Sequence, residues 1–248
     1  ASPNATTWFK RSNSLVASTR QSGNSMSLEN KTEYYSKKFD GLNLTGASFS
    51  EIVFEGCLFQ QCNFSDVRFY KCKFVDCEFS ASNLSNAKLD YSRWIDVNFK
   101  ESKLVGVDWT KADWPRFNLS ASISFSECII SDSSFYGLSL SEMELTHCKV
   151  HDVDFRNANF SKSSFIYSDF TNSLFMKTNL QEVDFSEAEN YDIDIFNNDI
   201  KFAKFSRMEA VRLLYCLETN HSVVYLGLAT LIFISMIGFG TKTNQLGC

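Results

Sequence analysis

The chain has little proline, little histidine and no excess of positive charge. Its 248 residues include two prolines and ten glycines, too few for a collagen-like or low-complexity protein. Lysine and arginine number 24 against 29 acidic residues, a formal charge of −5, which argues against the basic surface of an ordinary nucleic-acid-binding protein. Three histidines and eight cysteines argue against a multi-metal enzyme. Phenylalanine is the abundant residue, with 24 copies.

A large apolar residue returns at every fifth position between Phe39 and Phe205. The register slips by one residue between Leu119 and Phe125, and Asn190 is the one polar exception. The residues two positions earlier are mostly small or compact. A period of five fits neither an amphipathic helix nor an alternating strand. It suits a chain with two inward residues in five that turns a corner at each repeat.

Four such sides, one repeat each, close a square coil whose backbone pairs with the coils before and after it. At a strand-like spacing of about 4.8 Å per coil, roughly eight coils between Phe39 and Phe205 would span about 40 Å.

Segments such as 158–162 (ANFSK), 168–172 (SDFTN) and 183–187 (VDFSE) have a small residue, Asp or Asn, a Phe and two variable positions. This pattern resembles the pentapeptide-repeat family. The resemblance implies an all-β fold, a right-handed quadrilateral β-helix whose large and small residues fill the interior. We predict repeats over 36–205 with the slip at 120–124, after a non-repeat segment, 1–35, that includes a leader or an added sequence.

Six cysteines occupy the small inward position. They are Cys57, Cys62, Cys72, Cys77, Cys128 and Cys148. A free cysteine packs as a small hydrophobic residue, so we interpret the six as core. Disulfides between cysteines one coil apart are geometrically conceivable, but reduced thiols are favoured and indicate a reducing compartment. The spacings follow the repeat and do not match zinc sites.

Catalytic motifs are absent from the sequence. It contains no G-x-S-x-G, no glycine-rich phosphate loop and no H-E-x-x-H. A solenoid also lacks the concave pocket that small-molecule chemistry prefers. His147, His151 and His221 are scattered with respect to the repeat. We therefore predict a protein that is not an enzyme, with no catalytic residues, no metal site and no cofactor.

The two halves of the repeat differ in charge. Residues 36–120 hold 11 acidic and 11 basic residues, whereas residues 121–200 hold 14 acidic and four basic ones, a net −10. Acids separated by whole coils should align in outward columns. These are Asp132, Asp152 and Asp192, with Asn172 between them; Glu142 and Glu182, with Lys162 between them; and Glu144 and Asp184. The columns predict either an anionic binding face or a solvated surface that limits self-association.

A capping box, Ser206 with Glu209, predicts a C-terminal α-helix over 206–219. Its expected apolar face comprises Met208, Val211, Leu214, Tyr215 and Leu217. The chain resembles, in this respect, the repeat proteins of the quinolone-resistance type, which bind DNA gyrase. That resemblance implies that the helix caps the last coil and forms a homodimer.

The tail, 220–248, contains no charged residue from Ser222 to Gly240. This length is just enough to span a bilayer. The first interpretation is a membrane anchor, and the alternatives are a segment buried at a dimer interface or one that is not native to the repeat protein.

The leading hypothesis is a cytoplasmic, DNA-mimicking protein that binds a type II topoisomerase, DNA gyrase, and inhibits it or protects it from quinolones. It would not bind nucleic acid directly. The expected contact residues are Asp132, Asp152, Asp192, Glu142, Glu182, Trp114, Arg116 and Ser122. The alternative is a scaffolding protein tethered to a membrane by its tail and acting through protein–protein contacts.

Overall fold

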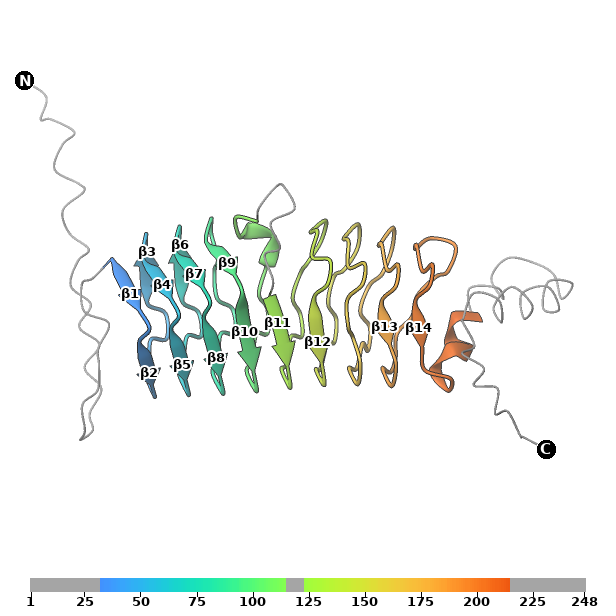
Figure 1. Cartoon of the computed structure of the whole chain (residues 1–248), viewed down its shortest axis with the longest axis horizontal. Coiled ribbons are helices and arrows are strands. Elements are labelled where there is room, and N and C mark those ends of the chain that lie inside the picture. The colour runs from blue at the N-terminus through green and yellow to red at the C-terminus, as the bar shows by residue number, and fades with distance from the viewer. Residues whose placement is uncertain (1–31, 115–122, 215–248) are drawn as a thin grey trace, which may run out of the picture. The chain divides into compact units, whose positions relative to one another are not determined.

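A computed structural model of the chain describes residues 32–114 and 123–214 (Figure 1). The chain divides into two compact units, Ala1–Ile123 and Ser124–Cys248. We call them unit 1 and unit 2 and describe each by itself. Both consist of short parallel strands and bridges that join successive coils.

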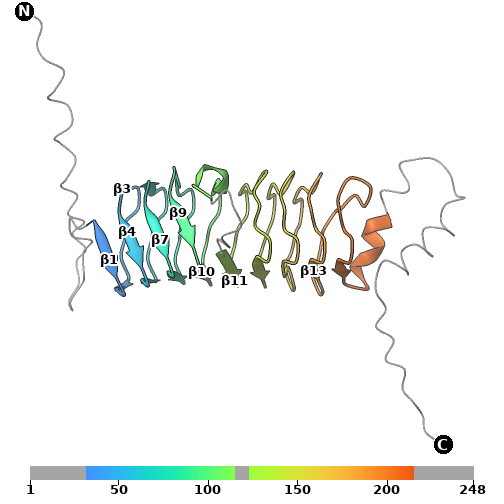
Figure 2. The ribbon, with the colours of Figure 1, turned by 45° about the horizontal axis from the view of Figure 1, so that its top comes forward.

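Unit 1 contains ten strands and one 3-10 segment among its described residues. They are β1 (Glu33–Tyr35), β2 (Lys38–Asp40), β3 (Ser48–Ser50), β4 (Val53–Glu55), β5 (Leu58–Gln60), β6 (Arg68–Tyr70), β7 (Lys73–Val75), β8 (Glu78–Ser80), β9 (Arg93–Ile95), β10 (Val97–Lys100) and η1 (Trp109–Lys111). The parallel orders β1-β4-β7-β9, which Figure 2 shows side by side, and β2-β5-β8-β10 form two faces of the coil. Phe54 pairs with Phe74 and Phe74 with Trp94, a register of four repeats that confirms the predicted coil.

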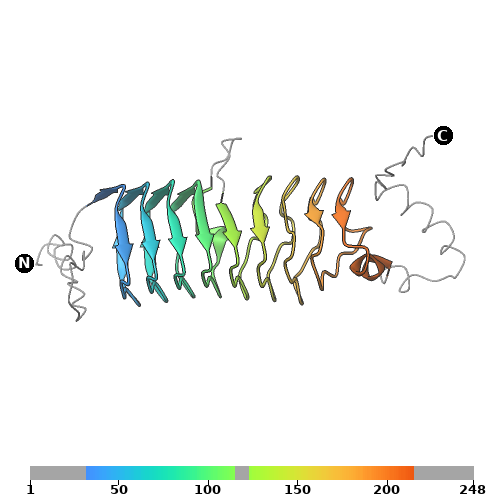
Figure 3. The ribbon, with the colours of Figure 1, turned by 60° about the horizontal axis from the view of Figure 1, so that its bottom comes forward.

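Unit 2 keeps the same register with fewer regular strands. It contains β11 (Ile123–Ser126) from its second residue on, β12 (Glu144–Thr146), β13 (Asp184–Phe185), β14 (Lys204–Phe205) and η2 (Glu209–Leu214). Isolated parallel bridges join the remaining coils, as between Ile129, Lys149 and Asp169. Figure 3 shows η2 after the last coil of the unit.

The interior is filled as the five-residue pattern predicts. Aromatic rings stack from coil to coil, with centroids 5.0 Å apart for Phe54 and Phe74 and 5.0 Å apart for Phe155 and Phe175. Several of the small inward positions hold serine or threonine, whose side chains bond to the backbone. Ser82 Oγ donates to a carbonyl of the preceding coil at 3.2 Å and accepts an N–H at 3.0 Å. These bonds explain how serine is buried without leaving polar groups unpaired. The repeat interior also begins before residue 36, because Tyr34 is buried in β1.

All six inward cysteines are free and buried, which confirms that they are part of the core. Burial raises the pKa of the Cys62 and Cys72 thiols to about 11. The hydrogen bond with Cys57, together with burial, also raises the pKa of Cys77. The thiols of Cys62 and Cys72 therefore stay protonated at neutral pH, and protonated thiols are poor nucleophiles.

The corners have a backbone conformation that the sequence pattern does not reveal. In most repeats the residue two positions after the large inward residue adopts a positive φ, for example 56° at Asp132 and 62° at Lys162. This left-handed region is uncommon for residues other than glycine, aspartate and asparagine. The corners are held from the next coil, as where the Asp132 N–H donates to the His151 carbonyl at 3.0 Å. The ladder therefore imposes the corner conformation on many residue types.

One coil of unit 2 departs from the register. Asp169 pairs with Glu189 as expected, but Phe175 pairs with Ile193, two positions short of the regular partner, and Asn179 again pairs regularly, with Asp199. The five-residue pattern assigns Asn190 to an inward position, but the residue lies at a corner and has a left-handed backbone, with φ 56°. Two residues are thus lost before Ile193 and regained before Asp199.

The predicted C-terminal α-helix is wrong for the residues that the structure describes. Glu209–Leu214 is a 3-10 segment, and 215–219 lies outside the described residues. The Ser206 Oγ accepts the Glu209 N–H at 3.2 Å, as a capping box requires. The Glu209 carboxylate, however, accepts the N–H of Asn190 at 2.9 Å instead of reaching back to Ser206.

The predicted dimerisation face is also not the buried one. Ala210 and Leu213 are buried, and their spacing of three fits a 3-10 turn. Met208 and Val211 are exposed and Leu214 is half-buried, while Tyr215 and Leu217 lie outside the described residues. The structure gives no support to a homodimer formed through an α-helix here. No helix within residues 32–114 and 123–214 is long and apolar enough to cross a membrane. The segment 222–240 lies outside that part of the chain.

Candidate partner-binding surface

Four of the predicted contact acids lie at corners of unit 2. Asp132 and Asp152 occupy the same corner in consecutive coils, and Glu142 and Glu182 occupy another, with Lys162 between them. All four acids are exposed and have φ between 56° and 64°. None of them forms an ion pair with any residue that the structure describes. Unit 2 therefore presents unneutralised carboxylates along its corners.

Sequence reasoning missed a third acidic corner. Glu127 and Glu187 are exposed, have φ of 57° and 56°, and share a corner with His147 and Tyr167. The imidazole of His147 stacks on the Tyr167 ring at a centroid distance of 4.7 Å. The signal was present, because Glu127 and Glu187 are separated by a whole number of coils.

Acids on the flat faces of unit 2 differ from the corner acids, because several have cationic partners. Asp154 Oδ2 forms an ion pair with Arg156 Nη2 at 2.8 Å, and Asp184 Oδ2 forms one with Lys204 Nζ at 2.9 Å. The hydrogen bonds from Arg156 lower the pKa of Asp154 below its usual range. The predicted column of Glu144 and Asp184 has the expected register, with Ser164 bridging them.

Asp192 does not belong to the column that the sequence predicts for it. The shift of register aligns Asn172 with Asn190, not with Asp192. Asp192 instead accepts hydrogen bonds from Arg212 of η2, the shorter at 2.9 Å. Counting by whole coils fails here because the intervening coil loses two residues and later regains them.

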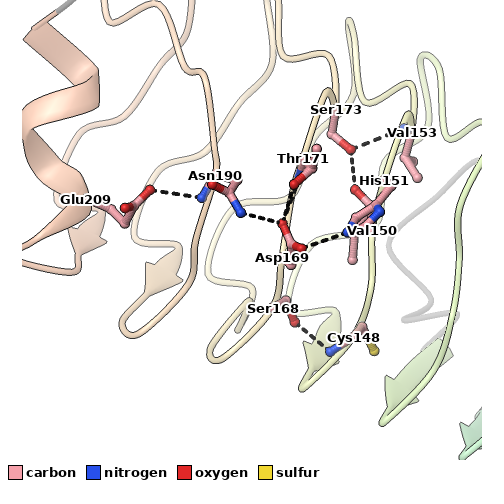
Figure 4. Close-up of polar contacts among 10 residues, drawn as sticks. All are labelled: Cys148, Val150, His151, Val153, Ser168, Asp169, Thr171, Ser173, Asn190 and Glu209. Carbon is pink, nitrogen blue, oxygen red and sulfur yellow. Dashed lines mark hydrogen bonds and ion pairs between the residues drawn. The ribbon is translucent and has the colours of Figure 1, made fainter.

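A polar network ties the end of unit 2 together (Figure 4). Asp169 accepts hydrogen bonds from the Thr171 hydroxyl at 2.7 Å and from the Asn190 side chain at 2.9 Å, and it contacts His151 Nε2 at 2.7 Å. Burial alone would raise the pKa of Asp169, but these hydrogen bonds outweigh it and lower the pKa to about 2. Glu209 continues the network from Asn190 to η2.

The remaining predicted contact residues flank the register slip. Trp114 is half-buried, and its Nε1 donates to the Trp109 carbonyl at 2.8 Å. The indole is therefore held against the end of unit 1 and is not fully presented to solvent. Arg116 and Ser122 lie outside the described residues. Within residues 32–114 and 123–214, no three His, Cys, Asp or Glu side chains group closely enough to hold a metal ion.

Two overlapping stretches, residues 47–122 and 107–185, match the family described as pentapeptide repeat region. The chain belongs to the pentapeptide-repeat family. In fold, this pentapeptide-repeat protein is similar to QnrB1, a plasmid-mediated fluoroquinolone resistance protein. One trypsin-treated QnrB1 variant has a TM-score of 0.58 and 20% identity over 75% of this chain and 96% of QnrB1. A second has a TM-score of 0.55 and 19% identity over 75% and 97%. No curated protein matches the chain in sequence.

Proposed function

We propose that this pentapeptide-repeat protein is a non-enzymatic binding protein whose acidic corners in unit 2 dock on the DNA-receiving surface of a type II topoisomerase. Bound there, it would inhibit the enzyme or protect it from quinolones. The fold likeness to a fluoroquinolone resistance protein supports the choice of partner. The observation that carries the proposal is the set of exposed corner carboxylates without ion-pair partners among the described residues.

The corner geometry favours an electrostatic contact. Consecutive coils place Asp132 and Asp152 one strand spacing apart, about 4.8 Å, so their charges add locally. A surface that receives DNA carries positive potential, which attracts such a row and accelerates association. Each corner is fixed by its ladder hydrogen bonds before binding. Less backbone entropy is then lost when the partner docks.

A supercoiling assay with DNA gyrase, with and without a fluoroquinolone, tests this proposal on the full-length protein. We expect the protein to change supercoiling, and Asp132→Asn/Asp152→Asn to raise the concentration for half effect roughly tenfold, equivalent to about 1.4 kcal/mol. Asparagine tolerates the left-handed corner, so circular dichroism should show an unchanged melting temperature. The effect should also weaken as salt is added, because exposed charges are screened.

Unit 1 offers a matched control. Asp76 and Asp96 also occupy one corner in consecutive coils, with φ of 50° and 52°. Asp76→Asn/Asp96→Asn makes the same chemical change, and we expect less than a twofold effect. An equal loss in both double variants would contradict a surface confined to unit 2. No effect of the wild-type protein on gyrase at micromolar concentration would exclude this partner.

A further inference from the structure

Exposed apolar side chains are concentrated near the C-terminal end of unit 2. In the described part of unit 1, the exposed large apolar residues are Tyr35 and Tyr91, whose hydroxyl groups suit solvent. The exposed residues without a polar group all fall between 174 and 211. They are Leu174, Met176, Phe196, Phe202, Met208 and Val211. We call these six residues the apolar margin.

The apolar margin belongs to the last two coils and η2. The amide of Lys177, which follows Met176, donates to the carbonyl of Asn197, which follows Phe196, so these segments are neighbours. Phe196 is 68% exposed, Phe202 64% and Met208 85%. Solvent-exposed apolar residues are normal when single, but six of them within the last two coils and 208–211 indicate an end of the unit that something covers.

Phe202 makes the departure from the repeat clear. Its corner is occupied by Glu142, Lys162 and Glu182 in the three preceding coils, all polar. Phe202 has φ 62°, a conformation that is rare for a bulky aromatic residue. Its ring is contacted by Lys201, with Nζ 5.0 Å from the centroid. An apolar ring held outward in this way is suited to contact another apolar group.

The last coil also has an edge that no further described coil covers. Strand β14 pairs with β13 on one side, and the described residues provide no strand on the other. At Asn190 the Glu209 carboxylate replaces the carbonyl that a further coil would supply. Segment η2 adds cover through Ala210 and Leu213. Solenoids require such terminal capping, because open edges invite pairing with another chain.

We propose that the apolar margin is the docking surface for the chain's own uncharged segment, 222–240. The linker 215–221 joins this segment to the last described residue, Leu214, and the segment carries no charged side chain along its whole length. A linker of that length reaches about 25 Å when extended. The two coils concerned are only about 4.8 Å apart. The linker is therefore several coil spacings long, enough for the segment to fold back over the last coils, and docking would bury apolar groups on both sides.

Site-specific photo-cross-linking in the full-length protein tests the proposal. p-Benzoylphenylalanine replaces Phe202 in one protein and Met208 in another, and it replaces Tyr91 of unit 1, 65% exposed, in the control. We expect both C-terminal probes to link to peptides from 222–240, at least tenfold more than the control does. Because the replaced residues are exposed, the folded structure should be retained, which circular dichroism checks.

A mixture of isotope-labelled and unlabelled chains separates the alternatives. Cross-links that join only chains of the same label support docking within one chain. Mixed-label cross-links would show that a second copy covers the margin, and would overturn the proposal. Adducts with lipid in the presence of vesicles, in place of links to 222–240, would identify a bilayer as the occupant and overturn it too. The absence of any link above the Tyr91 control would overturn it as well.

Discussion

Units 1 and 2 share an interior but differ at their corners. In unit 1, two of the five acidic corners have a basic neighbour: Lys71 Nζ lies 3.9 Å from Glu51, and Lys100 Nζ lies 3.8 Å from Glu101. In unit 2, the six corner acids have no such partner among the described residues. Both units stack aromatic rings at similar distances inside. The comparison teaches that the repeat interior specifies the coil, whereas the outward corners are free to carry a function.

The largest expected effect on stability tests whether buried aromatic rings contribute equally to the stability of the two units. Phe74→Ala in unit 1 and Phe165→Ala in unit 2 each remove a fully buried ring. Each should reduce the free energy of unfolding by about 3–5 kcal/mol, through lost transfer energy and a residual cavity. Chemical denaturation followed by circular dichroism measures both.

The exposed Tyr91 provides the control for this pair of variants. Tyr91→Ala should change the free energy of unfolding by less than about 0.5 kcal/mol, because most surface substitutions do. A small effect at only one of the two buried rings would show that the interiors of the units are not equivalent.

An intermediate effect concerns the polar network that unit 2 has around Asp169. Because hydrogen bonds lower the pKa of this carboxyl to about 2 in the folded state, its contribution to stability is present above the unfolded pKa of about 4. It is lost as the pH falls from about 4 towards 2. Asp169→Asn should cost about 1–2 kcal/mol at neutral pH, and the difference from wild type should shrink over that range. Urea denaturation at several pH values measures this.

Asp152→Asn is the matched change at an exposed corner of unit 2. We expect it to leave stability nearly unchanged at every pH in the same series. If the Asp169→Asn difference stayed constant down to pH 2, the network would not be stabilising the ionised carboxylate.

The smallest effect concerns the corners themselves. Gly41 of unit 1 and Gly137 of unit 2 have φ of 63° and 69°, and an added Cβ would meet no atom within 4 Å at either. Gly41→Ala and Gly137→Ala should therefore each cost only the conformational strain, about 1 kcal/mol. At Gly106 an added Cβ would lie 2.6 Å from Asn86 Oδ1. Gly106→Ala should lower the melting temperature more than either, and an equal drop at all three would show that the clash relaxes freely.

Much of the fold could be predicted because the interior repeats. Large residues at every fifth position and small ones two before them gave the coil length, the register and the buried cysteines correctly. The acids at Asp132, Asp152, Glu142 and Glu182 were placed correctly for the same reason. Asp192 was placed in the wrong column, because its coil loses two residues and later regains them. The outward residues of that coil do not indicate this change of register.

The sequence by itself determined the period, the inward residues and the uneven distribution of charge. The first two can be read from it because two positions in every five are buried, and burial restricts them to large apolar or small residues. The tertiary structure decided which acids remain unpaired, that the corners are left-handed, and that η2 buries Ala210 and Leu213 instead of Met208 and Val211. These features depend on contacts between residues of neighbouring turns of the chain, such as Glu209 with Asn190 and Arg212 with Asp192. Local patterns cannot reveal them, because the partner lies a full coil away in the sequence.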